Sequence, residues 1–133
     1  DDIAAGLSAG GAIEVRHELA PLSIAARDAV TLGVLTSELV MNAIKHAFPT
    51  CEPGTVSVVL GVQANGTPFL EVSDDGVGWH EVHTRESQGL GERIIELVAR
   101  QFGSSPERSA FAPGSKRPGT RIRVTLPKLE ILG

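Results

Sequence analysis

The sequence has one cysteine, Cys51, among its 133 residues. An internal disulfide is therefore impossible, which excludes a secreted fold stapled by disulfides and favours a reducing compartment. No apolar run approaches the roughly 20 residues that a membrane-spanning helix needs. The N-terminus also lacks the charged and then apolar order of a signal peptide. We therefore expect a cytoplasmic protein with no direct membrane insertion.

Basic residues are neither numerous nor clustered. The chain has 12 Lys and Arg against 16 Asp and Glu, and its formal net charge is -4. The positive patch of a nucleic-acid-binding protein is missing, so we expect no nucleic-acid partner. With 41% hydrophobic residues the chain can form one core, and residues 1–133 are predicted to be a single domain. It begins Asp1-Asp2-Ile3 without Met, and we expect a piece of a longer protein.

The first half of the chain predicts a strand and then a long helix. Residues 12–19 alternate apolar and polar side chains, as a strand with one buried face does, and Pro21 ends it. From Ser23, a suitable N-cap, to Phe48, apolar residues recur at helical spacing without a proline.

The rest of the chain predicts a β-hairpin followed by a mixed α and β segment. Residues 55–63 and 68–73 are rich in branched or aromatic side chains and flank Asn65-Gly66, a strong hairpin signal. The later segments are a polar Gly-rich stretch at residues 74–88, a helix at 89–102, a weak strand at 105–112, a turn-rich loop at 113–119 and a strand at 120–126. This order predicts a mixed β-sheet covered on one face by helices, a two-layer α/β sandwich.

Polar side chains form a stripe on the otherwise apolar long helix. Four of them fall at i, i+4, i+7 and i+8: Glu38, Asn42, Lys45 and His46. At this spacing they project from one side of a helix. An acid, an amide and a cation placed so can orient metal-bound water, offer an oxygen to Mg²⁺ and neutralise a phosphate. A solvated helix face is the alternative interpretation.

Three further motifs follow a strand, open a helix or precede a strand. Asp74 ends a strand ahead of Gly76 and Gly78, so its carboxylate can accept a hydrogen bond from an exocyclic amine; an ordinary Asp-Gly turn is the alternative. Gly89-Leu90-Gly91 opens a helix, where unpaired N–H groups and the helix dipole can bind an anion. Gly119-Thr120 precedes the last strand.

In this order the four motifs resemble those of the GHKL ATPase superfamily, which includes gyrase, the heat-shock chaperone of the same fold, mismatch-repair ATPases and histidine kinases. Residues 38–48 resemble the N box of histidine kinases, 74–78 the G1 box and 89–91 the G2 box. The resemblance runs from about residue 12 to residue 127. It implies the Bergerat-type fold and the catalytic ATP-binding domain of a sensor histidine kinase.

The chain departs from the common pattern in its lid. About ten residues separate Gly78 from Gly89, without a Phe-containing F box, which resembles the short-lid histidine kinases related to the HWE subgroup. Trp79-His80-Glu81 spells that subgroup's Trp-x-Glu, but it follows the G1 glycines, and Ser37 stands where the subgroup has His before Glu38. We treat this tripeptide match as accidental.

The resemblance implies roles for individual residues. Asn42 would ligate Mg²⁺, and Asp74 would read the adenine amino group with Thr120 supporting it. Lys45 would hold phosphates, and Glu38 would orient the metal shell, although the matching acid activates water in gyrase-like relatives. The implied catalytic residues are Glu38, Asn42 and Lys45, and the implied ATP-binding residues are Asn42, Lys45, His46, Asp74, Gly76, Gly78, Gly89, Leu90, Gly91 and Thr120.

The implied function is phosphoryl transfer from Mg-ATP to a histidine on a separate dimerisation domain of the same kinase, in cis or in trans within a dimer, with a response regulator downstream. The chain's own histidines lack the helical, acid-flanked setting of a phosphoacceptor: His17, His46, His80 and His83. Two alternatives stay open. One is an anti-sigma-factor-type serine kinase, and the other is a degenerate module that binds nucleotide as a regulatory ligand.

Overall fold

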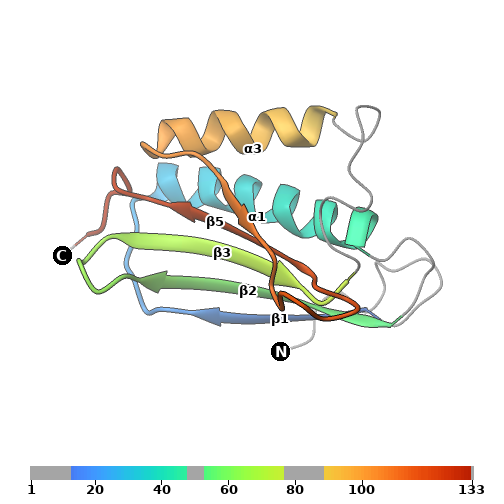
Figure 1. Ribbon diagram of the computed structural model, residues 1–133. Helices are drawn as coiled ribbons and strands as arrows, with labels where there is room; N and C mark the ends of the chain where they lie inside the picture. Colours follow the sequence, from blue (N-terminus) through green and yellow to red (C-terminus); the bar gives the residue numbers. More distant parts are fainter. Residues whose placement is uncertain (1–12, 48–52, 77–88, 133) are drawn as a thin grey trace.

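The structure, a computed structural model, describes residues 13–47, 53–76 and 89–132. Its elements are β1 (Ile13–Leu19), α1 (Ala26–Ala47), β2 (Gly54–Val62), β3 (Pro68–Asp74), α3 (Leu90–Gln101), β4 (Glu107–Ser109) and β5 (Thr120–Thr125). Within these ranges the strands form one sheet in the order β1-β2-β3-β5-β4. Only β1 and β2 pair in parallel. Both helices cover one face of this mixed sheet (Figure 1), which confirms the predicted fold class.

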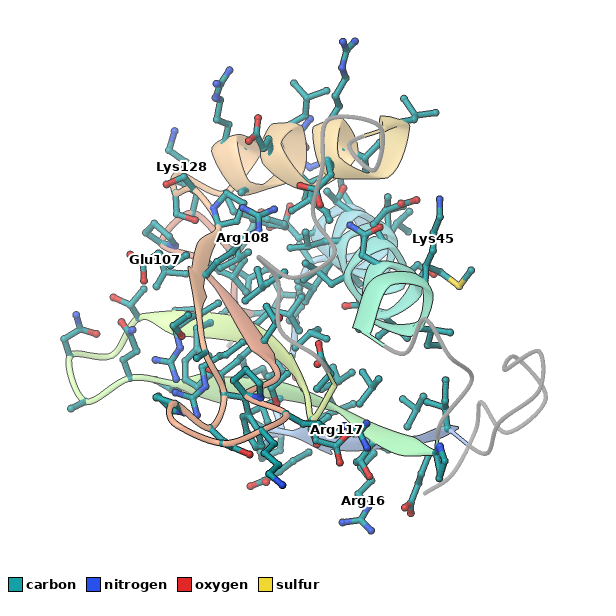
Figure 2. All side chains as sticks on the ribbon, turned by 45° about the vertical axis from the view of Figure 1, so that its right-hand side comes forward. Arg16, Lys45, Glu107, Arg108, Arg117 and Lys128 are labelled. Carbon is teal, nitrogen blue, oxygen red and sulfur yellow. The ribbon has the colours of Figure 1, made fainter. Side chains whose placement is uncertain are left out.

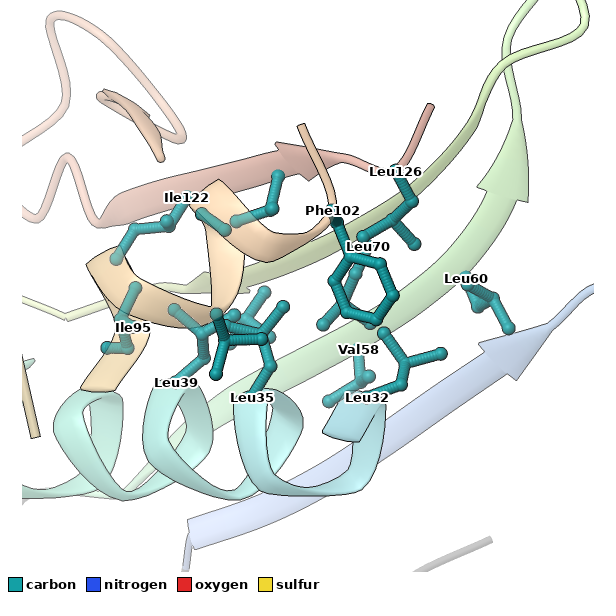
Figure 3. Close-up of a cluster of buried hydrophobic side chains, with 14 of the residues drawn as sticks. Leu32, Leu35, Leu39, Val58, Leu60, Leu70, Ile95, Phe102, Ile122 and Leu126 are labelled. Atoms are coloured by element: carbon teal, nitrogen blue, oxygen red, sulfur yellow. The ribbon is translucent and has the colours of Figure 1, made fainter. Parts of the chain in front are cut away.

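The hydrophobic core fills the space between the helices and the sheet (Figure 3). Leu32, Leu35 and Leu39 recur at i, i+3 and i+7 and form the apolar stripe that fixes α1 on the sheet. From α3, Ile95 packs into the same core and is fully buried. The apolar periodicity that predicts the two helices is therefore the pattern that buries them.

The opposite face of the sheet is polar where β3 and β5 pair. Ile122 and other alternate residues of β5 point into the core, while Arg121 and Arg123 point outward. Arg123 Nε lies 2.8 Å from Glu71 Oε1, and Arg121 Nε lies 3.5 Å from the other oxygen of the same carboxylate. This alternation confirms the predicted last strand and leaves β5 with one apolar face.

The hairpin predicted at Asn65-Gly66 is confirmed. Gly66 has a φ of +90°, which a residue with a side chain adopts only with strain. The N–H of Gln63 donates to the carbonyl of Thr67 at 2.9 Å, and the N–H of Thr67 donates to Asn65 Oδ1 at 2.9 Å. The turn fixes the register of β2 and β3 and thereby the position of Asp74 at the end of β3.

The prediction that Ser23 caps the long helix is wrong. Helix α1 begins at Ala26, because the residues before it pair with the C-terminal segment. Ile24 forms a β-bridge with Ile131, and the carbonyl of Ser23 accepts the N–H of Leu132 at 2.7 Å. This pairing holds residues 23–25 outside the helix. In the described ranges no helix combines the length and the apolar character needed to cross a membrane.

Candidate functional site

Four parts of the chain converge at one end of the molecule (Figure 1). The last turns of α1, the C-terminal end of β3, the first turn of α3 and the start of β5 all lie there. These are the four places where the sequence carries its motifs. The fold therefore gathers residues that lie far apart in the chain into one site.

Asp74 is a buried carboxylate at the end of a central strand, with 5% of its surface exposed. Its Oδ1 accepts the N–H of Gly76 at 2.9 Å, and its partner in the neighbouring strand is Thr120. Burial raises the pKa of Asp74 from 3.8 to about 6, although hydrogen bonds from the backbone of Gly76 and Thr120 act in the opposite direction. A carboxylate shielded from water and held from one side is suited to accept a hydrogen bond from a ligand.

Gly119 packs closely against the backbone of Asp74 and Gly76. Its φ is +66°, and a Cβ at this position would lie 2.0 Å from the carbonyl oxygen of Asp74. Its N–H donates to the carbonyl of Gly76 at 2.9 Å. No side chain fits here, because the obstructing atom belongs to the backbone. Thr120 follows directly, is buried, and donates a backbone hydrogen bond to the Asp74 carboxylate.

Two residues of the polar stripe of α1, Glu38 and Asn42, face the first turn of α3. A Cβ at Gly91 would lie 2.7 Å from Glu38 Oε1 and 3.5 Å from Asn42 Oδ1. The absence of a side chain at Gly91 thus allows α3 to approach these two polar groups closely. The structure brings Glu38, Asn42 and Gly91 together as the motif order predicts.

The start of α3 leaves backbone groups available to a ligand. Gly89 is the N-cap, and no side chain caps the helix there. Its φ of -136° is accessible to any residue, and nothing lies within 4 Å of the place a Cβ would take. Leu90 is 74% exposed. The first N–H groups of a helix lack intrahelical partners, and together with the helix dipole they make this turn a suitable anion site. Of the two glycines, only Gly91 is required by space.

The remaining expected site residues are Lys45, His46, Gly76 and Gly78. Lys45 is exposed and extends outward from α1 (Figure 2), so contact with a phosphate would use the reach of its side chain. Gly76 is buried beside Asp74. The side chain of His46, residue Gly78 and the lid at residues 79–88 lie outside the described residues.

The sequence analysis does not predict two residues of the site, Glu92 and Arg108. Glu92, on the first turn of α3, accepts the Asn42 side-chain N–H at 3.3 Å between Nδ2 and Oε2. Arg108, on β4, donates to the other oxygen of Glu92 at 2.6 Å. Only the position of Glu92 next to Gly91 could have drawn attention to it. Nothing local in the sequence indicates that residue 108 would reach it.

The donor set fits a hard divalent cation that brings other ligands with it. Asn42 Oδ1 and Glu38 Oε1 are oxygens, which Mg²⁺ prefers. Among the described residues, no group of three or more His, Cys, Asp or Glu could hold a metal ion by itself. This pattern suits Mg²⁺, which is commonly held by few protein oxygens together with water and substrate phosphates.

Comparison with known protein families identifies the family to which the chain belongs. A family model described as "Histidine kinase-, DNA gyrase B-, and HSP90-like ATPase" matches residues 27–130. The chain belongs to this family. The matched range contains β3, α3, β5 and all of α1 except its first residue, so all four converging parts of the site lie in the ATPase domain.

The relatives of the domain include histidine kinases. Blue-light-activated histidine kinase 2 of Erythrobacter litoralis (strain HTCC2594) is 29% identical over 118 residues, which cover 88% of this chain and 33% of that protein. The solved structure of the E. litoralis EL346 blue-light activated histidine kinase superposes with a TM-score of 0.73 at 26% identity, over 88% of this chain and 36% of that one. This relationship agrees with the resemblance to the HWE subgroup.

A second solved structure is matched over most of its own length. The mycobacterial sensor histidine kinase MprB matches with a TM-score of 0.69 at 25% identity, over 90% of this chain and 86% of that one. By contrast, the present chain spans about a third of the length of both Erythrobacter kinases. It therefore corresponds to the ATP-binding catalytic part of such proteins.

We predict that Gly119→Ala severely destabilises the domain, because its new methyl group would collide with the Asp74 carbonyl. Gly114→Ala is the matched control, since Gly114 also has a positive φ, +86°, but has nothing within 4 Å. The control should lose only about 1 kcal/mol of unfolding free energy, the cost of the strained φ. Urea unfolding measures both, and equal losses would contradict the proposed collision.

We also predict that Asp74→Asn changes the pH dependence of stability. The raised pKa of Asp74 means that its contribution to folding is fully present below about pH 3.8 and is lost as the pH rises through about 6. From about pH 5 to about pH 7.5, the stability of Asp74→Asn relative to wild type should therefore rise by about 1 kcal/mol. Unfolding titrations at both pH values test this, and a constant difference would rule out a raised pKa.

Proposed function

We propose that this domain binds Mg-ATP and donates the γ-phosphoryl group to a histidine on a separate domain of the same kinase. The observation that carries the proposal is the close packing of Gly91 against Glu38 and Asn42. It joins an anion-binding helix start to an acid and an amide, at the same end of the molecule as the buried Asp74 (Figure 1). Membership of the ATPase family supports ATP as the ligand.

At one end of the site, Asp74 would recognise the base. Its carboxylate can accept a hydrogen bond from the exocyclic amine of adenine, while Gly76 and Thr120 hold it from the protein side. A base without that amine would leave the buried carboxylate without a partner on the ligand side. We therefore expect the site to bind adenine more tightly than bases that lack this exocyclic amine.

At the other end, α1 and α3 would hold the phosphates. The first turn of α3 offers backbone N–H groups, Asn42 offers Oδ1 to Mg²⁺, and Lys45 reaches in from the rim. Glu38 would orient water in the metal shell. Bound Mg²⁺ supplies charge neutralisation on the phosphates, and the rest of the catalytic effect comes from positioning.

The nucleophile would come from another domain. A histidine nitrogen attacks the γ-phosphorus, the bond from that phosphorus to the β–γ bridging oxygen breaks, and ADP leaves with the bond's electron pair. The acceptor would lie on the kinase's dimerisation domain, in cis or in trans, and a response regulator would take the phosphoryl group next. The kinase relatives favour histidine over the serine acceptor of an anti-sigma-factor-type kinase. Intact Glu38, Asn42 and Asp74 favour activity over a degenerate, purely regulatory module.

The isolated chain should bind Mg-ATP without labelling itself, because the phosphoacceptor lies elsewhere. Incubation with γ-labelled ATP, alone and with the purified dimerisation domain of the full-length protein, tests this. We expect acid-labile, alkali-stable label on the added domain only. Stoichiometric label on the chain alone would place the acceptor within it, and acid-stable label on the partner would indicate a serine kinase.

Substitutions at the two ends of the site should differ in kind. Asp74→Asn puts an N–H donor opposite the adenine amine and should weaken ATP and ADP binding alike, by about 1 to 3 kcal/mol, with or without magnesium. Asn42→Asp puts a charge beside the phosphates and should mainly change the effect of magnesium on ATP binding. Asp75→Asn is a neighbouring control that retains the oxygen accepting the Thr55 N–H.

Calorimetric titrations with ATP, ADP and adenosine, in magnesium and in EDTA, separate these effects. Asp75→Asn should stay within about twofold of wild type for every ligand. If Asn42→Asp weakened adenosine binding as much as Asp74→Asn does, the division into an adenine end and a metal end would be wrong.

A further inference from the structure

Three side chains from three elements form a chain of polar contacts at the metal end of the site. Arg108 on β4 contacts Glu92 on α3 at 2.6 Å, and Glu92 in turn accepts the Nδ2–H of Asn42 on α1 at 3.3 Å. The side chains of Glu92 and Arg108 are 15% and 22% exposed. Both contacts are therefore largely shielded from water, where charge-assisted hydrogen bonds are strong. Arg108 lies beside α3 in Figure 2.

This chain of contacts determines which way the Asn42 amide faces. A side-chain amide has an NH₂ group that only donates and an oxygen that only accepts. An ionised carboxylate only accepts, so Glu92 requires the NH₂ group of Asn42 on its side. The amide oxygen then points elsewhere, and it lies 3.5 Å from the place that a Cβ of Gly91 would occupy. That place adjoins the helix start where phosphates are expected.

We propose that Glu92 is a positioning residue that fixes the Asn42 amide with its oxygen toward the metal, and that Arg108 fixes Glu92. This rests on the proposed function, in which Asn42 Oδ1 ligates Mg²⁺. Arg108 has only donors, so it holds one carboxylate oxygen and leaves the other for Asn42. Without Glu92 the amide can rotate by half a turn and present NH₂, which no cation can use.

The proposal predicts that Glu92→Gln reduces the effect of magnesium on ATP binding at least as much as Glu92→Ala does. Arg108 would take the oxygen of the introduced glutamine, and the glutamine NH₂ would then face Asn42. Asn42 would have to turn its oxygen toward that NH₂ and away from the metal. A purely structural role predicts the reverse order, because glutamine preserves the size and packing of glutamate whereas alanine removes both.

Removing Arg108 should rescue the glutamine variant. In the double variant Glu92→Gln with Arg108→Met, Arg108 no longer takes the glutamine oxygen, so the side-chain amide can turn and accept the Asn42 N–H. Glu96→Gln is the matched control, because Glu96 is exposed one turn further along α3.

The measurement is the ratio of the ATP dissociation constant in EDTA to that in magnesium, for the chain as it stands. We expect Glu92→Ala and Glu92→Gln to lower this ratio by roughly tenfold or more, as loss of a partner of a metal ligand commonly does. ADP binding in EDTA should stay within about twofold of wild type, which confirms that each variant is folded. The double variant should recover most of the ratio, and Glu96→Gln should keep all of it.

Asn42→Ala separates a failure of this inference from a failure of the proposed function. If Asn42→Ala leaves the ratio unchanged, Asn42 does not bind the metal and the assignment of the metal end falls. If Asn42→Ala lowers the ratio while the Glu92 variants match Glu96→Gln, the positioning role of Glu92 is overturned and the proposed function stands. A milder effect of Glu92→Gln than of Glu92→Ala, without rescue by Arg108→Met, would also overturn it.

Discussion

The close approach of α3 to α1 at Gly91 is the contact on which the rest of the site depends. Helix α1 is held on the sheet by its leucine stripe, and α3 brings its uncapped first turn against the polar side of α1. At Gly91 a methyl group would meet the Glu38 carboxylate at 2.7 Å. Because this position is glycine, the uncapped start of α3 and the side-chain oxygens of Glu38 and Asn42 can share one small space. A wider separation would leave two unconnected polar surfaces.

The end of the site around Asp74, proposed to bind adenine, depends on a different constraint, which works against stability. Burial of Asp74 raises its pKa to about 6, so near neutral pH the ionised carboxylate disfavours the folded state. Backbone hydrogen bonds from Gly76 and Thr120 offset only part of this effect. A ligand amine that reaches the carboxylate would supply the interaction that water provides in the unfolded chain. Under the proposed function, nucleotide binding and folding would therefore be coupled at Asp74.

Local patterns in the sequence predict most of the fold, and long-range pairings account for what they miss. The leucine spacing in α1, the Asn65-Gly66 turn and the alternation in β5 act over a few residues, so they can be recognised without the structure. Helix α1 nevertheless starts later than Ser23 predicts, because Ile24 pairs with Ile131 across the domain. In the site, motif order predicts that Glu38, Asn42 and Gly91 meet. It cannot predict Glu92 with Arg108, because their contact exists only once β4 has paired with β5.

The two ends of the site are open to evolutionary change to different degrees. At Gly119 the obstacle to any side chain is a backbone carbonyl, so no second substitution elsewhere can make room. At Gly91 the obstacle is the tip of the Glu38 side chain, which can rotate or be shortened by a compensating change. A substitution at Gly91 can therefore be accommodated by a change at Glu38, whereas one at Gly119 cannot be accommodated in this way. Under the proposed function, a chain that loses the close packing at Gly91 would be expected to keep nucleotide binding and lose phosphoryl transfer.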